Sequence, residues 1–346
     1  MAISYTVTCG SLRLSSEGPD ARPLLALRSE VGAGGAGGRC EIKLGDPSWG
    51  DPALGDAVEV ELDAGDGSSV IFTGEVDRVD RRAGLAGGQW IRCADALAKL
   101  ARVEVQGVYE EVSAGFIVKD LLDQAGTSAN AGDIEEGPTL PSYVVHRGPR
   151  ALRHVERIAT MIGGELSGDG AGKIHLRRPQ SGAAEHRLVW SEDLLAVELR
   201  RSEAPVDSFV VWGEGAAAAQ GPERGHWLVT DLSGVKGEAG VAPGAPGQSG
   251  TVTPGSSGER LRTVIDGAVR SAETAGDLAS ARASLVALRP LRGHALALGN
   301  PAIQPGSWIE LADLPGGGPG SAPVLRALRV IHSFDIERGL LTRVEF

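Results

Sequence analysis

Aromatic side chains are scarce in this chain. They make up 4% of its 346 residues, so its cores must be built mainly from valine, leucine, isoleucine and alanine. No apolar run is long enough to cross a bilayer as a helix. The N-terminus has neither the basic region nor the apolar stretch of a signal peptide. We therefore expect no membrane anchor and a protein that is made, and at first kept, in the cytoplasm.

Cysteine is also rare, with only Cys9, Cys40 and Cys93. Their spacing matches no metal motif, and an odd number does not suggest a disulfide framework. Cys40 and Cys93 each lie in a segment that is expected to be a strand. Buried free thiols are therefore the expected state.

Positive charge is in deficit, because the net charge is −11. A nucleic-acid surface would normally show a basic face, so no nucleic-acid partner is expected. Local basic clusters at 147–157 and 177–178 lie among acidic residues. They are expected to be solvated or interface charge.

Catalytic and cofactor motifs are missing as well. The sequence contains no HExxH, no zinc-ligand spacing, no GxSxG and no P-loop. The glycine run 32–38 formally contains GxGxxG, but a strand follows it instead of the helix that a dinucleotide site needs. We therefore predict no catalytic residue, no metal site and no cofactor.

Glycine (50 residues) and proline (19 residues) are abundant and together make up about a fifth of the chain. This composition favours short strands and turns. Regular alternation predicts roughly six antiparallel strands in about the first hundred residues. Among them is a strand at 71–80 with a bulge or a close backbone approach at Gly74.

Helix signals are fewer. Asp95 is expected to cap a short helix at 96–100, and Ser113 to cap a helix that Gly126 ends. An amphipathic helix is predicted at 151–162, with Gly163 at its end.

The C-terminal part is expected to be another strand-rich region. Strands are predicted at 208–213, 292–301, 305–311, 324–334 and 341–346. Between them, 215–258 is predicted to be a long exposed loop, with one strand at 226–229. Residues 259–288 are predicted to be helical.

An ordered series of short motifs resembles the late control D proteins of contractile phage tails. This family belongs with the baseplate hub and with the hub part of VgrG proteins. The series departs from the family at 147–150. The positions that carry the resemblance are Gly45, Asp46, Pro47, Gly55, Asp56, Phe72, Thr73, Gly74, Asp95, Gly126, Gly163, Pro305, Gly306 and His332.

The resemblance implies a mainly β fold with an α+β insertion: two tail-tube-like β-barrel domains plus a small mixed α/β domain. The implied division is 1–102, 103–205 and 206–346, the last containing the glycine-, proline- and serine-rich loop 215–258. The positions of the series would hold backbone geometry, and none would be catalytic.

The same resemblance implies a homotrimer whose barrels form a pseudo-sixfold ring. This ring would join a separate spike protein to the inner tube or tube-initiator protein and would contact other baseplate proteins. The machine could be a phage tail, a tailocin or an extracellular injection system. Two other functions stay open: a tail-associated hydrolase of the cell envelope, and a generic β-rich binding module.

Overall fold

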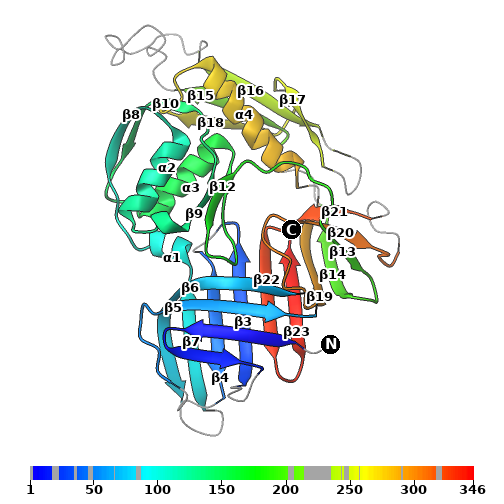
Figure 1. The fold of residues 1–346 in the computed structure, drawn as a ribbon. Coiled ribbons are helices and arrows are strands. Elements are labelled where there is room, and N and C mark those ends of the chain that lie inside the picture. The colour runs from blue at the N-terminus through cyan, green and yellow to red at the C-terminus, as the bar shows by residue number, and fades with distance from the viewer. Residues whose placement is uncertain are drawn as a thin grey trace.

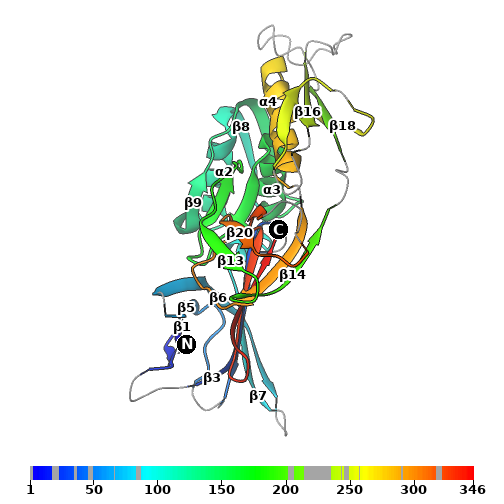
Figure 2. The same ribbon diagram turned by 90° about the vertical axis from the view of Figure 1, so that its right-hand side faces the viewer.

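The computed structural model describes most of the chain. The described residues are 3–17, 23–34, 37–45, 50–65, 67–82, 87–201, 206–213, 235–242, 244, 249–256, 258–289, 291–316 and 322–346. Figure 2 shows an elongated molecule, with the strands nearest the N-terminus at one end and helices at the other.

One sheet of eleven strands contains both ends of the chain. Its N-terminal members are β1 (Ser4–Cys9), β2 (Leu12–Ser15), β3 (Leu24–Gly32), β4 (Arg39–Leu44), β5 (Ala57–Asp63), β6 (Ser68–Arg82) and β7 (Gly88–Ala94). Its C-terminal members are β14 (Leu194–Arg200), β19 (Arg292–Leu298), β22 (Arg329–Asp335) and β23 (Gly339–Glu345). The order is β14-β19-β23-β22-β3-β4-β7-β6-β5-β1-β2.

The two halves of this sheet meet where β3 pairs with β22, with Val31 opposite Val330. Within the N-terminal part of the sheet, the strands fold over at β6. This strand pairs with β5 along its first half and with β7 along its second half. Figure 1 shows the result as two layers of crossing strands in the lower part of the molecule. Apolar side chains of both layers, such as Phe72 and Ile42, fill the space between them.

A mixed region follows the first layers. It contains α1 (Ala96–Leu100), β8 (Gly107–Ser113), α2 (Ala114–Gln124), the 3-10 turn η2 (Ser128–Asn130), β9 (Ala131–Ile134), β10 (Thr139–Val145), α3 (Ala151–Ile162), β11 (Glu165–Gly168) and β12 (Ile174–Arg177). The apolar stripe of α3, with Leu152, Val155 and Ile158, is buried as its spacing predicts.

A second α/β unit packs on this region. The sheet β17-β16-β15-β18 is formed by β15 (Ser208–Gly213), β16 (Lys236–Ala242), β17 (Thr251–Pro254) and β18 (Leu261–Asp266), and α4 (Ala272–Ala287) covers one face. Its apolar residues share one core with α2 and α3. Helices α3 and α4 lie side by side in both views.

A third hydrophobic core lies between the C-terminal strands of the large sheet and a small sheet. The small sheet β13 (His186–Val189), β20 (Trp308–Ala312) and β21 (Val324–Arg326) packs there against β14, β19 and β23. The three cores group the chain differently from the division into 1–102, 103–205 and 206–346. That division stays a prediction about separate folding units.

The mainly β fold with a mixed insertion is confirmed: twenty-three strands and four α-helices are described. The two expected halves are present as sheets that share one hydrogen-bonded order. The end strands of the eleven-stranded sheet, β14 and β2, do not pair with each other among the described residues. The cysteines are buried and free, as expected. No helix in the described part of the chain is long and apolar enough to span a membrane.

Two predicted segments are wrong. Within 215–258, residues 236–242 and 251–254 form β16 and β17. The glycines of β16 reflect packing, because a Cβ on Gly237 would lie 2.1 Å from the carbonyl carbon of Ala275 in α4. Within 259–288, the first residues form β18, and the helix begins at Ala272. The predicted strand 226–229 lies outside the described residues.

Candidate functional site

Gly55 and Asp56, two of the motif positions, lie in the turn that precedes β5. Gly55 has φ +88°, in the left-handed region that favours glycine, and its N–H donates to the carbonyl of Val76 at 2.9 Å. Asp56 accepts from the N–H of Ala53 at 2.9 Å and so closes the turn. Gly45 directly follows β4, whereas Asp46 and Pro47 lie outside the described residues.

The strand β6 and the start of α1 meet at Gly74 and Asp95. A Cβ on Gly74 would lie 2.3 Å from the carbonyl oxygen of Ala94, so the predicted close approach is confirmed. Asp95 caps α1 by accepting from the N–H of Ala98 at 3.0 Å, and it also accepts from Gly38 at 2.6 Å. Burial raises the pKa of Asp95, although these backbone N–H groups counter the effect.

The next two motif positions end helices. Gly126, with φ +67°, follows α2, and Gly163, with φ +65°, is the left-handed cap of α3. A Cβ on Gly163 would lie 2.2 Å from the Cβ of Ala281, so this glycine also lets α3 approach α4.

The last motif positions belong to the C-terminal strands. Pro305 and Gly306 form the turn before β20, and the N–H of Gly306 donates to Ala327 at 2.7 Å. His332 lies in β22, where its Nδ1 is 3.1 Å from the hydroxyl of Thr342. Burial lowers the pKa of His332 to about 4, so the ring is neutral at pH 7.

The motif positions are therefore spread over turns, caps and strand crossings. Thr73 also meets another part of the chain closely: a Cβ on Gly172, in the β11–β12 loop, would lie 3.1 Å from the carbonyl oxygen of Thr73. Their placement matches the role the resemblance implied, which is backbone geometry. That role stays a prediction for each position.

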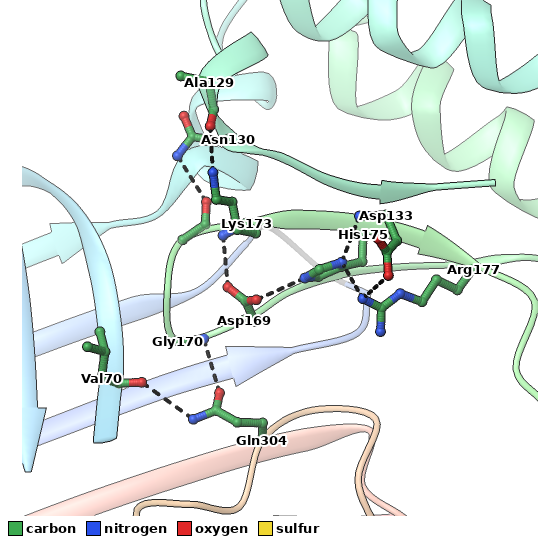
Figure 3. Close-up of polar contacts among 11 residues, drawn as sticks. Val70, Ala129, Asn130, Asp133, Asp169, Gly170, Lys173, His175, Arg177 and Gln304 are labelled. Carbon is green, nitrogen blue, oxygen red and sulfur yellow. Dashed lines mark hydrogen bonds and ion pairs between the residues drawn. The ribbon is translucent and has the colours of Figure 1, made fainter. Parts of the chain in front are cut away.

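The loop between β11 and β12 is a junction of three regions (Figure 3). The N–H of Gly170 donates to Oε1 of Gln304 at 3.1 Å, and Nε2 of Gln304 donates to the carbonyl of Val70 at 3.4 Å. A Cβ on Gly170 would lie 2.3 Å from that same carbonyl oxygen, so only glycine fits there. Gln304 thus links the mixed region, β6 and the turn before β20.

A polar cluster holds the base of this loop (Figure 3). The N–H of Asp133 donates to Nδ1 of His175 at 3.1 Å, so the His175 proton lies on Nε2, which is 2.9 Å from Asp169. Burial opposes the charge of Asp169, but hydrogen bonds from His175 and from the N–H of Lys173 outweigh it and lower its pKa. The cluster is arranged to fix a loop.

Glu165 forms a second junction. This buried residue of β11 contacts Arg289, which follows α4, with one carboxylate oxygen, and Arg326 of β21 with the other. Because both oxygens are bound by guanidinium groups, Glu165 joins three regions and has no free oxygen for acid–base chemistry.

The exposed face of the eleven-stranded sheet carries rows of opposite charges. Glu30 of β3 lies 2.9 Å from Arg329 of β22, across the strand pair that joins the two halves. Arg329 and Arg343 both approach Glu345, at 4.0 and 3.7 Å. Exposed pairs of this kind are each worth less than about 1 kcal/mol, so they add specificity more than stability.

A cleft of about 610 Å³ opens on this charged face, beside α1. Its lining includes Arg28, Arg39, Glu41, Arg92 and Arg102. The lining also includes Cys40 of β4 and Cys93 of β7, which are directly opposite each other in the sheet. Burial raises the pKa of both thiols, so they are protonated and unreactive.

The end strands of the large sheet are the remaining candidate surface. On β14, Leu195 is 47% exposed, and on the adjacent β19 Leu298 is 48% exposed. At the other end, β2 pairs only with β1 among the described residues. Open strand edges with apolar side chains are sites where another chain can pair.

Gln304 and Glu165, which join separate regions of the fold, are positions that the sequence reasoning missed. A lone glutamine after Ile303 and a glutamate at the start of a strand carry no local signal. Their partners lie 134 and 161 residues away in sequence, at Gly170 and Arg326.

Comparison with solved structures identifies the fold. No protein-family model matches the sequence, and no curated protein matches it. In structure, the chain is similar to a 43 kDa tail protein of prophage MuSo2 from Shewanella oneidensis. The two are 12% identical, with a TM-score of 0.69 over 99% of this chain and 98% of that one.

Two further solved structures are also similar to this chain in fold. A tail protein from Neisseria meningitidis is 12% identical, with a TM-score of 0.69 over 100% of this chain and 96% of that one. The E. coli c3393 protein, a type VI secretion component with structural similarity to the T4 tail proteins gp27 and gp5, is 12% identical. Its TM-score is 0.59 over 98% of this chain and 75% of that one. The resemblance to the baseplate hub and tail proteins is thus confirmed at the level of the fold.

Proposed function

We propose that this chain is a structural subunit of the baseplate hub of a contractile injection machine. The observation that carries the proposal is the match of fold over the whole chain to phage tail proteins and to a type VI secretion component. The proposed role is mechanical, because the buried polar groups of the described residues, such as Glu165 and Asp95, hold parts of the fold together.

The proposed assembly is a homotrimer. Each copy contributes the two halves of its large sheet, so three copies supply six similar units around an axis. Such a ring would adapt a threefold spike on one side to a sixfold inner tube on the other. A contact in which the β14 edge meets a different surface of the next copy closes into a ring when the rotation is right.

The proposed partners are a separate spike protein, the inner tube or tube-initiator protein and other baseplate proteins. Assembly would take place in the cytoplasm before the particle is released. Neither nucleic acid nor a membrane is a proposed partner, because the net charge is −11 and the exposed sheet face pairs its charges internally.

Sedimentation of the purified chain, alone and mixed with a candidate spike protein, tests this proposal. A trimer, alone or formed when the spike is added, is the expected result. A monomer that does not bind the spike would rule out the hub and leave the binding-module alternative.

A further inference from the structure

The open edge of the sheet that α4 covers has an unusual composition. β18 ends the order β17-β16-β15-β18 and, among the described residues, pairs only with β15. Its Leu261 is 51% exposed and its Ile265 is 65% exposed. Proteins normally protect such edges with charges or a covering segment, because open N–H and C=O groups recruit other strands.

The two faces of β18 differ in chemistry. Side chains alternate along a strand, so Leu261 and Ile265 share one face, while Arg262, Val264 and Asp266 share the other. Val264 packs against the core that contains α4, which identifies the second face as the α4 side. The apolar face is therefore on the outside of the sheet.

An excess of positive charge lies on the α4 side. A pocket of about 360 Å³ beside the end of β18 is lined by Arg153, Glu156, Arg157, Thr160, Asp266 and Arg282. Its two carboxylates already have partners: Arg157 lies 3.5 Å from Asp266, and Arg153 lies 3.2 Å from Glu156.

Arg282 and Arg262 lack such partners. Neither forms an ion pair or a hydrogen bond within the described part of the chain, and Nε of Arg282 is buried and unsatisfied. Burial, and then the neighbouring charge of Arg262, lower the pKa of Arg282. An unpaired, partly buried guanidinium is costly, and an incoming carboxylate would remove that cost.

We propose that β18 is a docking edge for an extended segment of a partner protein in which apolar residues alternate with glutamate or aspartate. The segment would add a strand to the sheet, the mode in which main-chain hydrogen bonds give affinity and alternate side chains give specificity. Its apolar side chains would contact Leu261 and Ile265, and its carboxylates would contact Arg262 and Arg282.

Charge complementarity selects this occupant. An acidic strand places single carboxylates at alternate positions. On the α4 side of β18 these would meet two arginines without partners among the described residues, Arg262 of β18 and Arg282 of α4. A polyphosphate chain fits less well, because it has no apolar groups to contact the exposed side chains of Leu261 and Ile265. The inference concerns a surface other than β14 and does not depend on the proposed ring.

A fluorescently labelled peptide of alternating valine and glutamate tests the proposal against the full chain, with a valine–lysine peptide as its control. Anisotropy should show saturable binding of the first peptide only. Arg282→Glu and Ile265→Lys should each weaken binding by about tenfold or more, because they remove the carboxylate contact and the apolar contact respectively. Arg13→Glu and Ile336→Lys, exposed residues elsewhere, should leave binding unchanged.

Hydrogen exchange supplies the second readout, with peptide-dependent protection expected along β18. Absence of saturable binding, equal binding of the lysine peptide, or protection elsewhere would overturn the proposal. Self-association of the free chain that Ile265→Lys abolishes would assign the edge to a second copy and would also overturn it. Thermal unfolding of each variant confirms that loss of binding is not loss of folding.

Discussion

Glu165 is the residue on which three regions of the molecule depend. Removing its carboxylate leaves Arg289 and Arg326 without their shared anion, and Arg326 has a side chain that is only 17% exposed. We expect Glu165→Ala to lower the free energy of unfolding by roughly 3 kcal/mol. Glu156→Ala is the matched control: its partner Arg153 is 78% exposed, so a loss below about 1 kcal/mol is expected. Denaturant titration measures both, and equal losses would contradict the account.

The buried His332 makes the free energy of unfolding depend on pH. Its pKa is about 4 in the folded protein and 6.5 when unperturbed, so the unfolded state binds more protons between these values. Stability is therefore lost as pH falls from 6.5 towards 4, by about 3 kcal/mol in all from this residue.

Comparison with His332→Gln isolates this effect from that of the carboxylates. The stability advantage of the native chain over the variant should shrink as pH falls through that range. A constant difference, measured by denaturant titration at several pH values, would show that His332 does not carry the pH dependence.

At the scale of elements, glycines decide how closely β16 and α4 approach. A Cβ on Gly237 would lie 2.1 Å from the carbonyl carbon of Ala275, in backbone that cannot move aside alone. Gly237→Ala should therefore cost roughly 1–3 kcal/mol. Gly276 in α4 has open space around its Cβ position, so Gly276→Ala should raise stability by about 0.5–1 kcal/mol. If the melting temperatures of Gly237→Ala and Gly276→Ala shift in the same direction, the proposed packing role of Gly237 is contradicted.

The β14 edge is the element that the ring proposal requires. Leu195→Glu places a charge on an apolar, 47% exposed position and should prevent copies from associating while the chain stays folded. Leu54→Glu, at a 70% exposed position before β5, is the control. Light scattering should show monomers for the first and trimers for the second. Trimers for both would place the contact elsewhere.

Elements with local signals were predicted well from sequence. The helix 151–162, the Asp95 cap and the close approach at Gly74 all follow from residues within a few positions of one another. The strand β16 was missed because its glycines read as a loop, whereas they permit contact with α4. β18 was missed because an alanine-rich pattern was extended backwards over its β-branched residues.

At the scale of the whole molecule, the sequence indicated the family fold but not the shared sheet. The pairing of β3 with β22 joins segments about 300 residues apart, and the contacts of Gln304 with Gly170 and of Glu165 with Arg326 span 134 and 161 residues. Such contacts leave no local pattern. The ordered motif series succeeded because it describes turns and caps, which are local features.

The central claim is a threefold ring with six similar lobes. Electron microscopy of the chain with its spike protein tests it most directly, through class averages viewed along the axis. We expect three copies around a closed ring, with two lobes of the large sheet from each copy. Class averages that show single copies, or a twofold assembly, would contradict the account.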